Sequence, residues 1–158
     1  MERTLVIFKP DAVQRGLVGE IMSRFEKKGL KIVALEMRHL DDTIVSEHYK
    51  EHREKHFYNT LKKFIQAAPV VLMALEGLDC VAVVRSMVGK TNGREANNGT
   101  IRSDYSMSTS YNCIHASASV DEANEEIKRF FDPSDVMDYT LLMQEYTYAM
   151  DELEGNNK

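Results

Sequence analysis

The spacing of apolar residues divides the chain into expected strands and helices. The near-continuous apolar centre of residues 3–9 is typical of a buried strand, and further strands are predicted at residues 30–40, 69–75 and 112–118. Apolar side chains recur at helical spacing from Leu17 to Phe25, and Gly29 follows as a natural C-terminal stop. The other predicted helices cover residues 43–67, with a break near 57–59, then 79–89 and 119–131.

Short signals mark the ends of several elements. Pro10 closes the first strand, because a residue before proline is pushed to extended geometry, and it can open a short helix. Asp79 can cap the helix that follows it, and Ser119 fits a capping box with Glu122. Residues 90–111 show neither a helical nor a strand period of apolar residues, so they are predicted to form a loop of about 20 residues. A loop of this length in a compact domain is usually functional or disordered.

The order of these elements predicts an α+β fold. It runs strand, helix, strand, helices, strand, helix, strand, helix, without an internal repeat or a linker. Two strand–helix–strand halves indicate a ferredoxin-like sandwich, a four-stranded antiparallel sheet with helices, which we expect on one face. A length of 158 residues suits one domain. We expect this domain to span residues 1–153 and a disordered tail to follow at 154–158.

Composition narrows the class of partner. The chain carries 20 Lys and Arg against 25 Asp and Glu, a net charge of −5, so bulk electrostatic binding to nucleic acid or to an anionic membrane is not expected. No apolar run approaches the roughly 20 residues of a membrane span, and no signal peptide is visible. Cys80 and Cys113 sit among apolar neighbours and are expected to be buried reduced thiols. These features predict a soluble cytoplasmic protein.

His115 has a setting that suits chemistry. It follows apolar Cys113 and Ile114 at the end of a predicted strand and precedes the capped helix that begins near Ser119. Helix N-termini favour anionic groups such as phosphate, and a neutral imidazole nitrogen is a competent nucleophile near neutral pH. From this local pattern alone, a histidine that simply packs at the end of a strand is the favoured interpretation.

Three other histidines recur every fourth residue. His48, His52 and His56 would share one face of an unbroken helix, a spacing that can hold a metal ion. The charged residues between them favour a solvated face instead, and no neighbouring cysteine or carboxylate completes an obvious ligand set.

Three basic residues lie in structured or turn-rich contexts that suit phosphate. They are Lys9 after the first strand, Arg85 on the predicted helix at 79–89, and Arg102 in the long loop. Each alone is also typical of a surface charge. The sequence contains neither a Walker loop nor the Gly-rich loop and His-Arg-Asp signature of protein kinases.

Several stretches occur in an order that is highly specific when taken together. The first runs from Arg3 to Ile21 and begins Arg-Thr-Leu-Val-Ile-Phe-Lys-Pro-Asp-Ala-Val. The others are Thr91-Asn92, Gly99-Thr100-Ile101-Arg102 with Asp104, and Asn112-Cys113-Ile114-His115. With these landmarks the chain resembles the nucleoside diphosphate kinase family over nearly its whole length.

The resemblance implies transfer of the γ-phosphoryl group from a nucleoside triphosphate, such as ATP, to a nucleoside diphosphate. His115 would take up the phosphoryl group and hold it as phosphohistidine until an acceptor arrives, in a ping-pong scheme. Phe57 would stack on the base, and Glu126 would orient the second nitrogen of the histidine. The other matched residues would contact phosphates or sugar, or support the nucleophile: Lys9, Arg85, Thr91, Arg102 and Asn112 for the ligand, Tyr49 and Ser117 near the histidine.

The chain departs from the family around the nucleophile. The family usually reads His-Gly-Ser-Asp, where this chain has Ala116 and Ala118 in place of the glycine and the aspartate. Ala116 would be costly only if that backbone needs positive φ. The aspartate lies near the Mg²⁺ of the nucleotide, chiefly through water. We therefore expect Mg²⁺ as cofactor, held mainly by nucleotide phosphates and water with no direct protein ligand, and more weakly organised than in the family.

The resemblance also implies a homo-oligomer, specifically a hexamer. Gly93 and Asn98 stand where the family often has proline, in a loop that packs at subunit contacts, so softer contacts are expected. Two other functions stay open at this point. One is a non-catalytic nucleotide- or nucleic-acid-binding member of the same fold, and the other is a metal-binding regulatory module that uses His48, His52 and His56.

Overall fold

The structure, a computed structural model, describes residues 1–142 and 144–155. Four antiparallel strands form one sheet in the order β2-β3-β1-β4, as predicted for a ferredoxin-like sandwich. The strands are β1 (Glu2–Phe8), β2 (Lys31–Arg38), β3 (Val70–Gly77) and β4 (Ile114–Ala116). β1 lies between β3 and β4, and its register places Ile7 opposite His115.

Helices connect the strands at or near the predicted positions. The longer ones are α2 (Val18–Lys27), α4 (Tyr58–Ile65), α5 (Cys80–Val88) and α7 (Val120–Phe130). The shorter ones are α1 (Pro10–Gln14), α3 (Asp42–His48), α6 (Ile101–Tyr105) and α8 (Met150–Gly155). Single turns of 3-10 helix occur at Lys50–His52, Gly93–Glu95, Pro133–Asp135 and Gln144–Tyr146.

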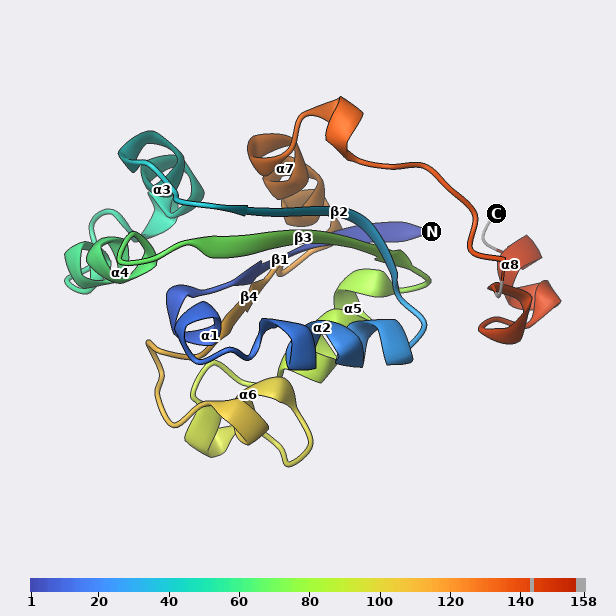
Figure 1. Ribbon diagram of the computed structural model, residues 1–158, viewed down its shortest axis with the longest axis horizontal. Helices are drawn as coiled ribbons and strands as arrows, with labels where there is room; N and C mark the ends of the chain where they lie inside the picture. Colours follow the sequence, from blue (N-terminus) through green and yellow to red (C-terminus); the bar gives the residue numbers. More distant parts are fainter. Residues whose placement is uncertain (143, 156–158) are drawn as a thin grey trace.

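Helices cover both faces of the sheet, so the expectation of one covered face is wrong. Figure 1 shows α1, α2, α5 and α6 on one side of the sheet, α3 and α7 on the other, and α4 at one end. Ile65 of α4 belongs to the same core as Phe130 of α7. Along β1, Val6 and Phe8 belong to the first core, whereas Leu5 and Ile7 belong to the second. Because the central strands are buried on both faces, their apolar runs are nearly continuous instead of alternating.

Two segments differ from the predicted elements. The helix expected over residues 43–67 is interrupted between α3 and α4, over residues 49–57, which is earlier and longer than predicted. The stretch expected to lack structure, residues 90–111, contains α6. Thr100 caps α6 by accepting the N–H of Ser103 at 3.4 Å. A helix of five residues is too short to produce a recognisable apolar period.

Of the two predicted helix caps, one is confirmed and one is wrong. The Ser119 hydroxyl accepts the N–H of Glu122 at 3.2 Å and so caps α7. Asp79 precedes α5 with a left-handed φ of 47°, but its side chain makes no capping hydrogen bond, so that prediction is wrong. Apart from Asp79, Cys113 is the one non-glycine residue with positive φ in the described part of the chain. Ala116 therefore replaces the glycine of the family without backbone strain.

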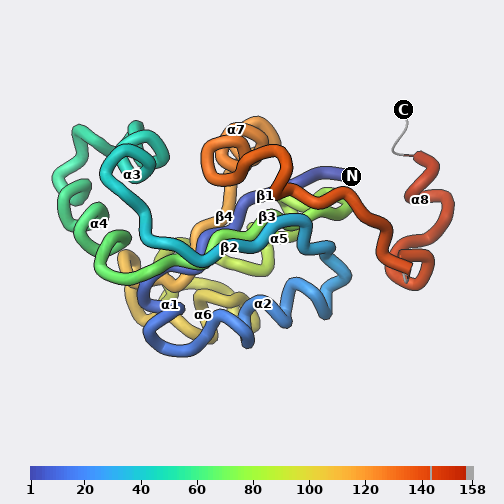
Figure 2. Tube along the Cα trace, turned by 45° about the horizontal axis from the view of Figure 1, so that its top comes forward, coloured from blue at the N-terminus to red at the C-terminus, as the bar shows by residue number. Residues whose placement is uncertain are grey.

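The chain after α7 returns along β2 and then leaves the body of the molecule. The N–H of Met137 donates to the carbonyl of Val33 at 2.7 Å. Farther on, Figure 2 shows α8 standing apart from the sheet and the helices that cover it. Residues 154–155 of the expected tail end α8, and residues 156–158 lie outside the described part. Within that part, no helix has both the length and the apolar character that a membrane crossing needs.

Candidate active site

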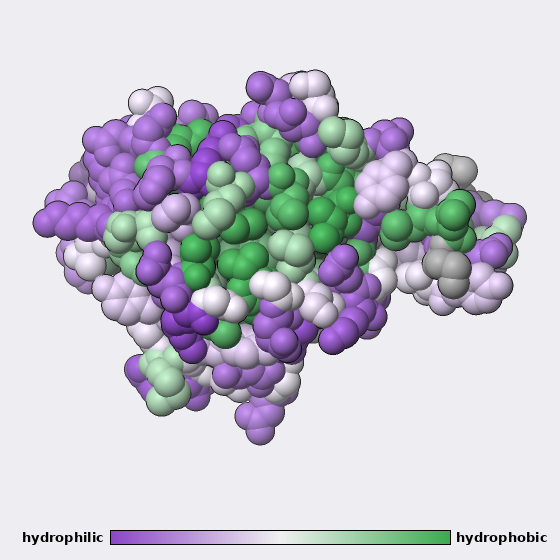
Figure 3. Space-filling view, in the orientation of Figure 1, coloured by the Kyte–Doolittle hydropathy of each residue, from purple (hydrophilic) through white to green (hydrophobic). Residues whose placement is uncertain are grey.

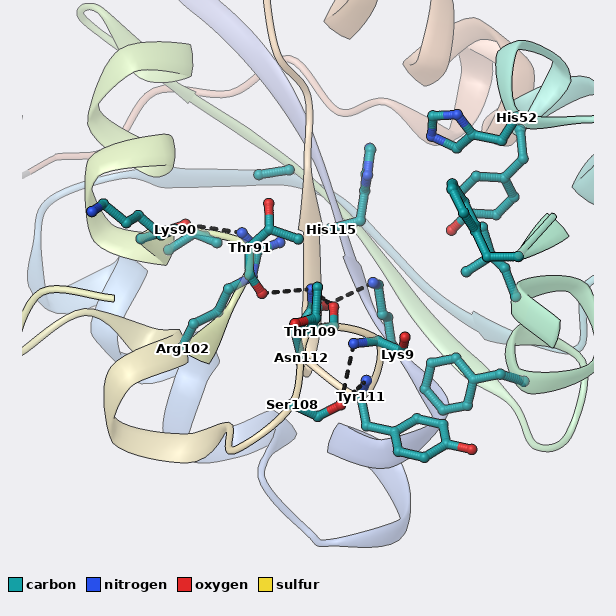
Figure 4. Close-up of a pocket in the computed structure, with 18 of the residues that line it drawn as sticks. Lys9, His52, Lys90, Thr91, Arg102, Ser108, Thr109, Tyr111, Asn112 and His115 are labelled. Atoms are coloured by element: carbon teal, nitrogen blue, oxygen red, sulfur yellow. Dashed lines mark hydrogen bonds between the residues drawn. The ribbon is translucent and has the colours of Figure 1, made fainter. Parts of the chain in front are cut away.

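A cavity of about 740 Å³ lies beside β4, between the α3–α4 region and the loops around α6. It brings together eight of the ten residues that the family resemblance marks. These eight line its wall: Lys9, Tyr49, Phe57, Arg85, Thr91, Arg102, Asn112 and His115. Figure 4 shows His115, Lys9 and Asn112 near the centre of the cavity, with Arg102 on one side and His52 on the other.

The two remaining residues, Ser117 and Glu126, lie directly behind His115. Glu126 is on the buried face of α7, and its Oε1 is 3.0 Å from Nε2 of His115. The hydroxyl of Ser117 donates to Oε2 of Glu126 at 2.5 Å, and the N–H of Leu5 donates to that hydroxyl at 3.1 Å. Both carboxylate oxygens are therefore occupied, and the imidazole is tied to the centre of the sheet.

The ionisation of Glu126 fixes which nitrogen of His115 is free. Burial of Glu126 acts to raise its pKa, but the hydrogen bonds from His115 and Ser117 outweigh burial, so the pKa of Glu126 is lowered. An ionised carboxylate only accepts hydrogen bonds, so Nε2 of His115 carries the proton. The lone pair of the neutral ring is then on Nδ1, the nitrogen that a nucleophilic histidine needs.

Lys9 is held where β1 ends. Its Nζ donates to Oδ1 of Asn112 at 2.7 Å, and its N–H donates to the carbonyl of Cys113 at 2.8 Å. The amide of Asn112 donates in turn to the carbonyl of Thr91 at 3.1 Å. The strained backbone at Cys113 is fixed by its N–H, which donates to Oδ2 of Asp11 at 2.9 Å. These bonds join the loops on both sides of the cavity to the first strand.

The cations of the cavity lie close enough to repel one another. Burial, and then the charge of Arg102, lower the pKa of Lys9 from 10.5 to about 8. Burial, and then the charge of Arg85, lower the pKa of Arg102 from 12.5 to about 10. Arg102 is anchored by donation to the carbonyls of Gly89 at 2.9 Å and Ile114 at 2.7 Å. A bound anion would relieve this repulsion, which suits phosphate.

The other end of the cavity is aromatic and partly apolar. Phe57 is half exposed, and the ring of His52 packs against it with centroids 5.5 Å apart. Phe64 and Tyr111 form a second pair, with centroids 4.5 Å apart. The cavity thus offers cations at one end and ring faces at the other, which matches the phosphates and the base of a nucleotide.

The row of histidines does not behave as predicted. Because the helix breaks after His48, the three histidines do not share a face. His48 is not solvated: its side chain is 2% exposed, and its ring meets that of His115 edge-on, with centroids 4.8 Å apart. His52 lines the cavity. Among the described residues, the one group able to share a metal ion is His48, His115 and Glu126, so His48, His52 and His56 do not form the metal site that the sequence left open as an alternative.

Several lining residues had no sequence signal of their own. Lys90 and the segment Ser108–Tyr111 come from the stretch expected to be structureless, and the sequence around His52 favours a solvated face. Thr60, Leu61 and Phe64 lie on α4, whose position was predicted but whose orientation toward the cavity was not.

The lining residues do not form a protein site for Mg²⁺. Within the described chain, no aspartate or glutamate lines the cavity. Oxygen donors such as carboxylates are the ligands that Mg²⁺ takes from proteins, so the ion would have to arrive with the nucleotide.

A ferredoxin-like sheet that presents a histidine to a cationic, nucleotide-sized cavity defines an α+β enzyme of phosphoryl transfer. The sequence matches the family Nucleoside diphosphate kinase over residues 2–136. It is 49% identical over 148 residues to the nucleoside diphosphate kinase of Methanothermobacter thermautotrophicus, covering 94% of this chain and 99% of the relative. It is 50% identical to that of Parabacteroides distasonis, covering 96% and 99%.

Solved structures agree with the sequence matches. A halophilic nucleoside diphosphate kinase from Halobacterium salinarum, in complex with CDP, superposes with a TM-score of 0.91. It is 42% identical, over 93% of this chain and 98% of that one. A family protein from Babesia bovis gives a TM-score of 0.90 at 40% identity, over 94% and 100%. The chain belongs to the nucleoside diphosphate kinase family.

Proposed function

We propose that the protein passes the γ-phosphoryl group of a nucleoside triphosphate to a nucleoside diphosphate through a phosphohistidine at His115. One observation carries this proposal. His115 faces a cationic cavity while its Nε2 is paired with the buried Glu126 carboxylate at 3.0 Å. The relative from H. salinarum was solved in complex with CDP, which supports a nucleoside diphosphate in the same cavity.

The reaction has two half-reactions at one site. In the first, the lone pair of Nδ1 of His115 forms a bond to the γ-phosphorus, and the bond from that phosphorus to the β–γ bridging oxygen breaks. The departing diphosphate keeps the electron pair on that oxygen. In the second, a terminal β-phosphate oxygen of the acceptor attacks the phosphorus, and the electron pair of the N–P bond returns to Nδ1.

The side chains around the cavity act mainly by position and charge. Negative charge spreads over the transferring oxygens in the transition state, where Lys9, Arg85 and Arg102 would face it. Arg102 is already fixed by two carbonyls, so little reorganisation is needed when substrate binds. Thr91 and Asn112 contact phosphate or sugar. Glu126 stabilises the positive character that the imidazole gains when Nδ1 is phosphorylated.

The aromatic end sets the orientation of the nucleotide. Phe57 stacks on the base, and because a ring face accepts any base, broad base use follows. Tyr49 is buried beside the histidines, where burial raises the pKa of its hydroxyl and keeps it neutral. Mg²⁺ accompanies the triphosphate, held by its phosphates and water. We further propose that the protein acts in the cytoplasm.

We also propose that the protein is a homo-oligomer, specifically a hexamer as the family resemblance implies. β2 is an edge strand of the sheet, and Leu35 and Met37 on it are 52% and 57% exposed. Figure 3 shows hydrophobic side chains gathered on the face where Figure 1 places β2. Exposed apolar side chains on an edge strand favour association. A stable monomer at micromolar concentration in sedimentation would refute the assembly.

Initial rates test the scheme. With ATP varied at several fixed GDP concentrations, a ping-pong enzyme gives parallel double-reciprocal lines. His115→Gln should lower the rate by at least about 10³-fold, because it removes the imidazole lone pair that attacks the γ-phosphorus. Intersecting lines, or a variant that retains transfer, would contradict the proposal.

A further inference from the structure

The phosphate end of the cavity is unbalanced in charge. Lys9, Arg85, Lys90 and Arg102 line the cavity, and no carboxylate accompanies them among the described residues. Repulsion is already visible in the free protein, where Arg102 contributes to the lowered pKa of Lys9 and Arg85 to that of Arg102. The cavity therefore attracts an anion more strongly than a neutral or weakly charged ligand.

The carboxylates that follow His115 in the chain do not offset these cations. Glu126 is behind the ring and accepts hydrogen bonds from His115 and Ser117. The carboxylate of Glu122, in the first turn of α7, accepts the N–H of Ala118 just before the helix at 3.3 Å. Ala118 itself is exposed and offers only a methyl group. The charge of Asp11 also acts on Lys9, but Asp11 does not line the cavity, so the lining that a ligand phosphate meets is cationic.

We infer that this site binds nucleoside diphosphates in their metal-free form, with protein cations neutralising the phosphates in place of Mg²⁺. This inference rests on the proposed function, because it takes the acceptor diphosphate to be the ligand of the cavity. A metal-free diphosphate keeps the negative charge that Mg²⁺ would otherwise cancel, so its attraction to the cations is larger. Binding without the metal also avoids the removal of water from Mg²⁺, an ion that dehydrates reluctantly.

Lys90 is the outermost of the four cations. It is exposed, follows directly after Gly89, and in Figure 4 its side chain points away from His115. The four-carbon stem lets its ammonium turn toward a phosphate at the rim, where a flexible point charge is suited to a mobile anion. Lys90 would therefore contact the terminal phosphates only once a nucleotide is bound.

Isothermal titration of the full chain with GDP, in EDTA and in Mg²⁺, tests the inference. We expect the Kd in EDTA to equal or lie below the Kd in Mg²⁺. Ala116→Asp, at a residue that lines the cavity, should weaken binding in EDTA by about tenfold, because it adds a carboxylate to the cationic lining, and Mg²⁺ should restore the affinity. A parent protein that binds about tenfold more weakly in EDTA, or an aspartate variant that matches the parent in both buffers, would overturn the inference.

A matched pair of lysine variants tests the rim cation. Lys128 is an exposed lysine on α7 that pairs with Glu125 and does not line the cavity. We expect Lys90→Gln to raise the Kd for GDP in EDTA about threefold to tenfold, while Lys128→Gln leaves it unchanged. Equal affinities for the two variants would overturn the role given to Lys90.

Phosphorylation of the protein by ATP and Mg²⁺ separates this inference from the proposed function. If His115 becomes labelled but GDP binds poorly in EDTA, only the inference fails. If GDP binds tightly in EDTA but no label reaches the protein, the proposed function fails.

Discussion

Glu126→Gln is the substitution that most sharply probes how the nucleophile is prepared. The two side chains have nearly the same shape, so the packing of α7 against β1 is retained. The change removes the negative charge that accepts from Nε2 of His115 at 3.0 Å and from Ser117 at 2.5 Å. It therefore tests charge and proton placement, not volume.

The expected loss follows from the kind of hydrogen bond that is replaced. A bond to a charged group contributes about 1.5–3 kcal/mol, against about 0.5–1.5 kcal/mol for a neutral pair, so the variant loses the difference, about 1–1.5 kcal/mol, as positive charge grows on the ring of His115. This corresponds to phosphorylation that is about 5- to 10-fold slower. If the amide nitrogen faced Nε2, it would donate and push the ring proton onto Nδ1, where it blocks the lone pair.

Single-turnover phosphorylation of the protein by ATP, measured by rapid quench, gives the rate directly. Glu125→Gln is the matched control, because Glu125 is one residue earlier on α7 but its side chain is 70% exposed. The control should keep the parent rate, and both variants should bind GDP with the parent affinity. A Glu126→Gln rate within about twofold of the parent would refute the orientation of His115 given above.

Three further predictions concern pH and packing. Because the pKa of Lys9 is about 8, kcat/KM for ATP should fall as the pH rises above that value. The Lys9→Met variant should have a low kcat/KM that does not show this alkaline decline. Burial, and then the charge of His115, lower the pKa of His48 from 6.5 to about 3. As pH falls, His48 therefore takes up a proton in the unfolded chain before it does so in the folded protein. The free energy of unfolding should decrease by about 2 kcal/mol between pH 6.5 and about pH 5. Urea unfolding of His48→Phe should show a flatter pH dependence, and an unchanged slope would contradict the assignment. A Cβ at Gly93 would collide with the backbone of Ser106, so Gly93→Ala should cost about 1–3 kcal/mol, whereas exposed Asn98→Ala should cost little. Equal urea midpoints for these two would contradict that packing.

The sheet could be predicted from the sequence because its strands are long apolar runs. β1 and β3 lie within two residues of their predicted limits, and Gly89 and Ser119 bound helices where expected. The covered faces could not be predicted in the same way. A continuous apolar run shows that a strand is buried, but it does not show that helices from different parts of the chain cover both sides.

The residues of the site also differ in how far the sequence alone predicts them. His115 could be singled out by its place between an apolar strand and a capped helix, whereas Glu126 looks like an ordinary exposed charge without the family resemblance. Its role depends on a pairing across eleven positions of the chain that only the folded α7 and β4 create. His48 was misjudged because its sequence neighbours are charged, although packing against Tyr49, His115 and Phe130 buries it.

Transfer of label through the isolated protein tests the central claim most directly. The protein is mixed with γ-labelled ATP and Mg²⁺, freed of nucleotide, and then given GDP. We predict one acid-labile, base-stable label per chain, carried by His115, that moves to GTP, and no label on His115→Ala. Label that forms on the alanine variant, or that stays on the protein when GDP is added, would contradict the claim.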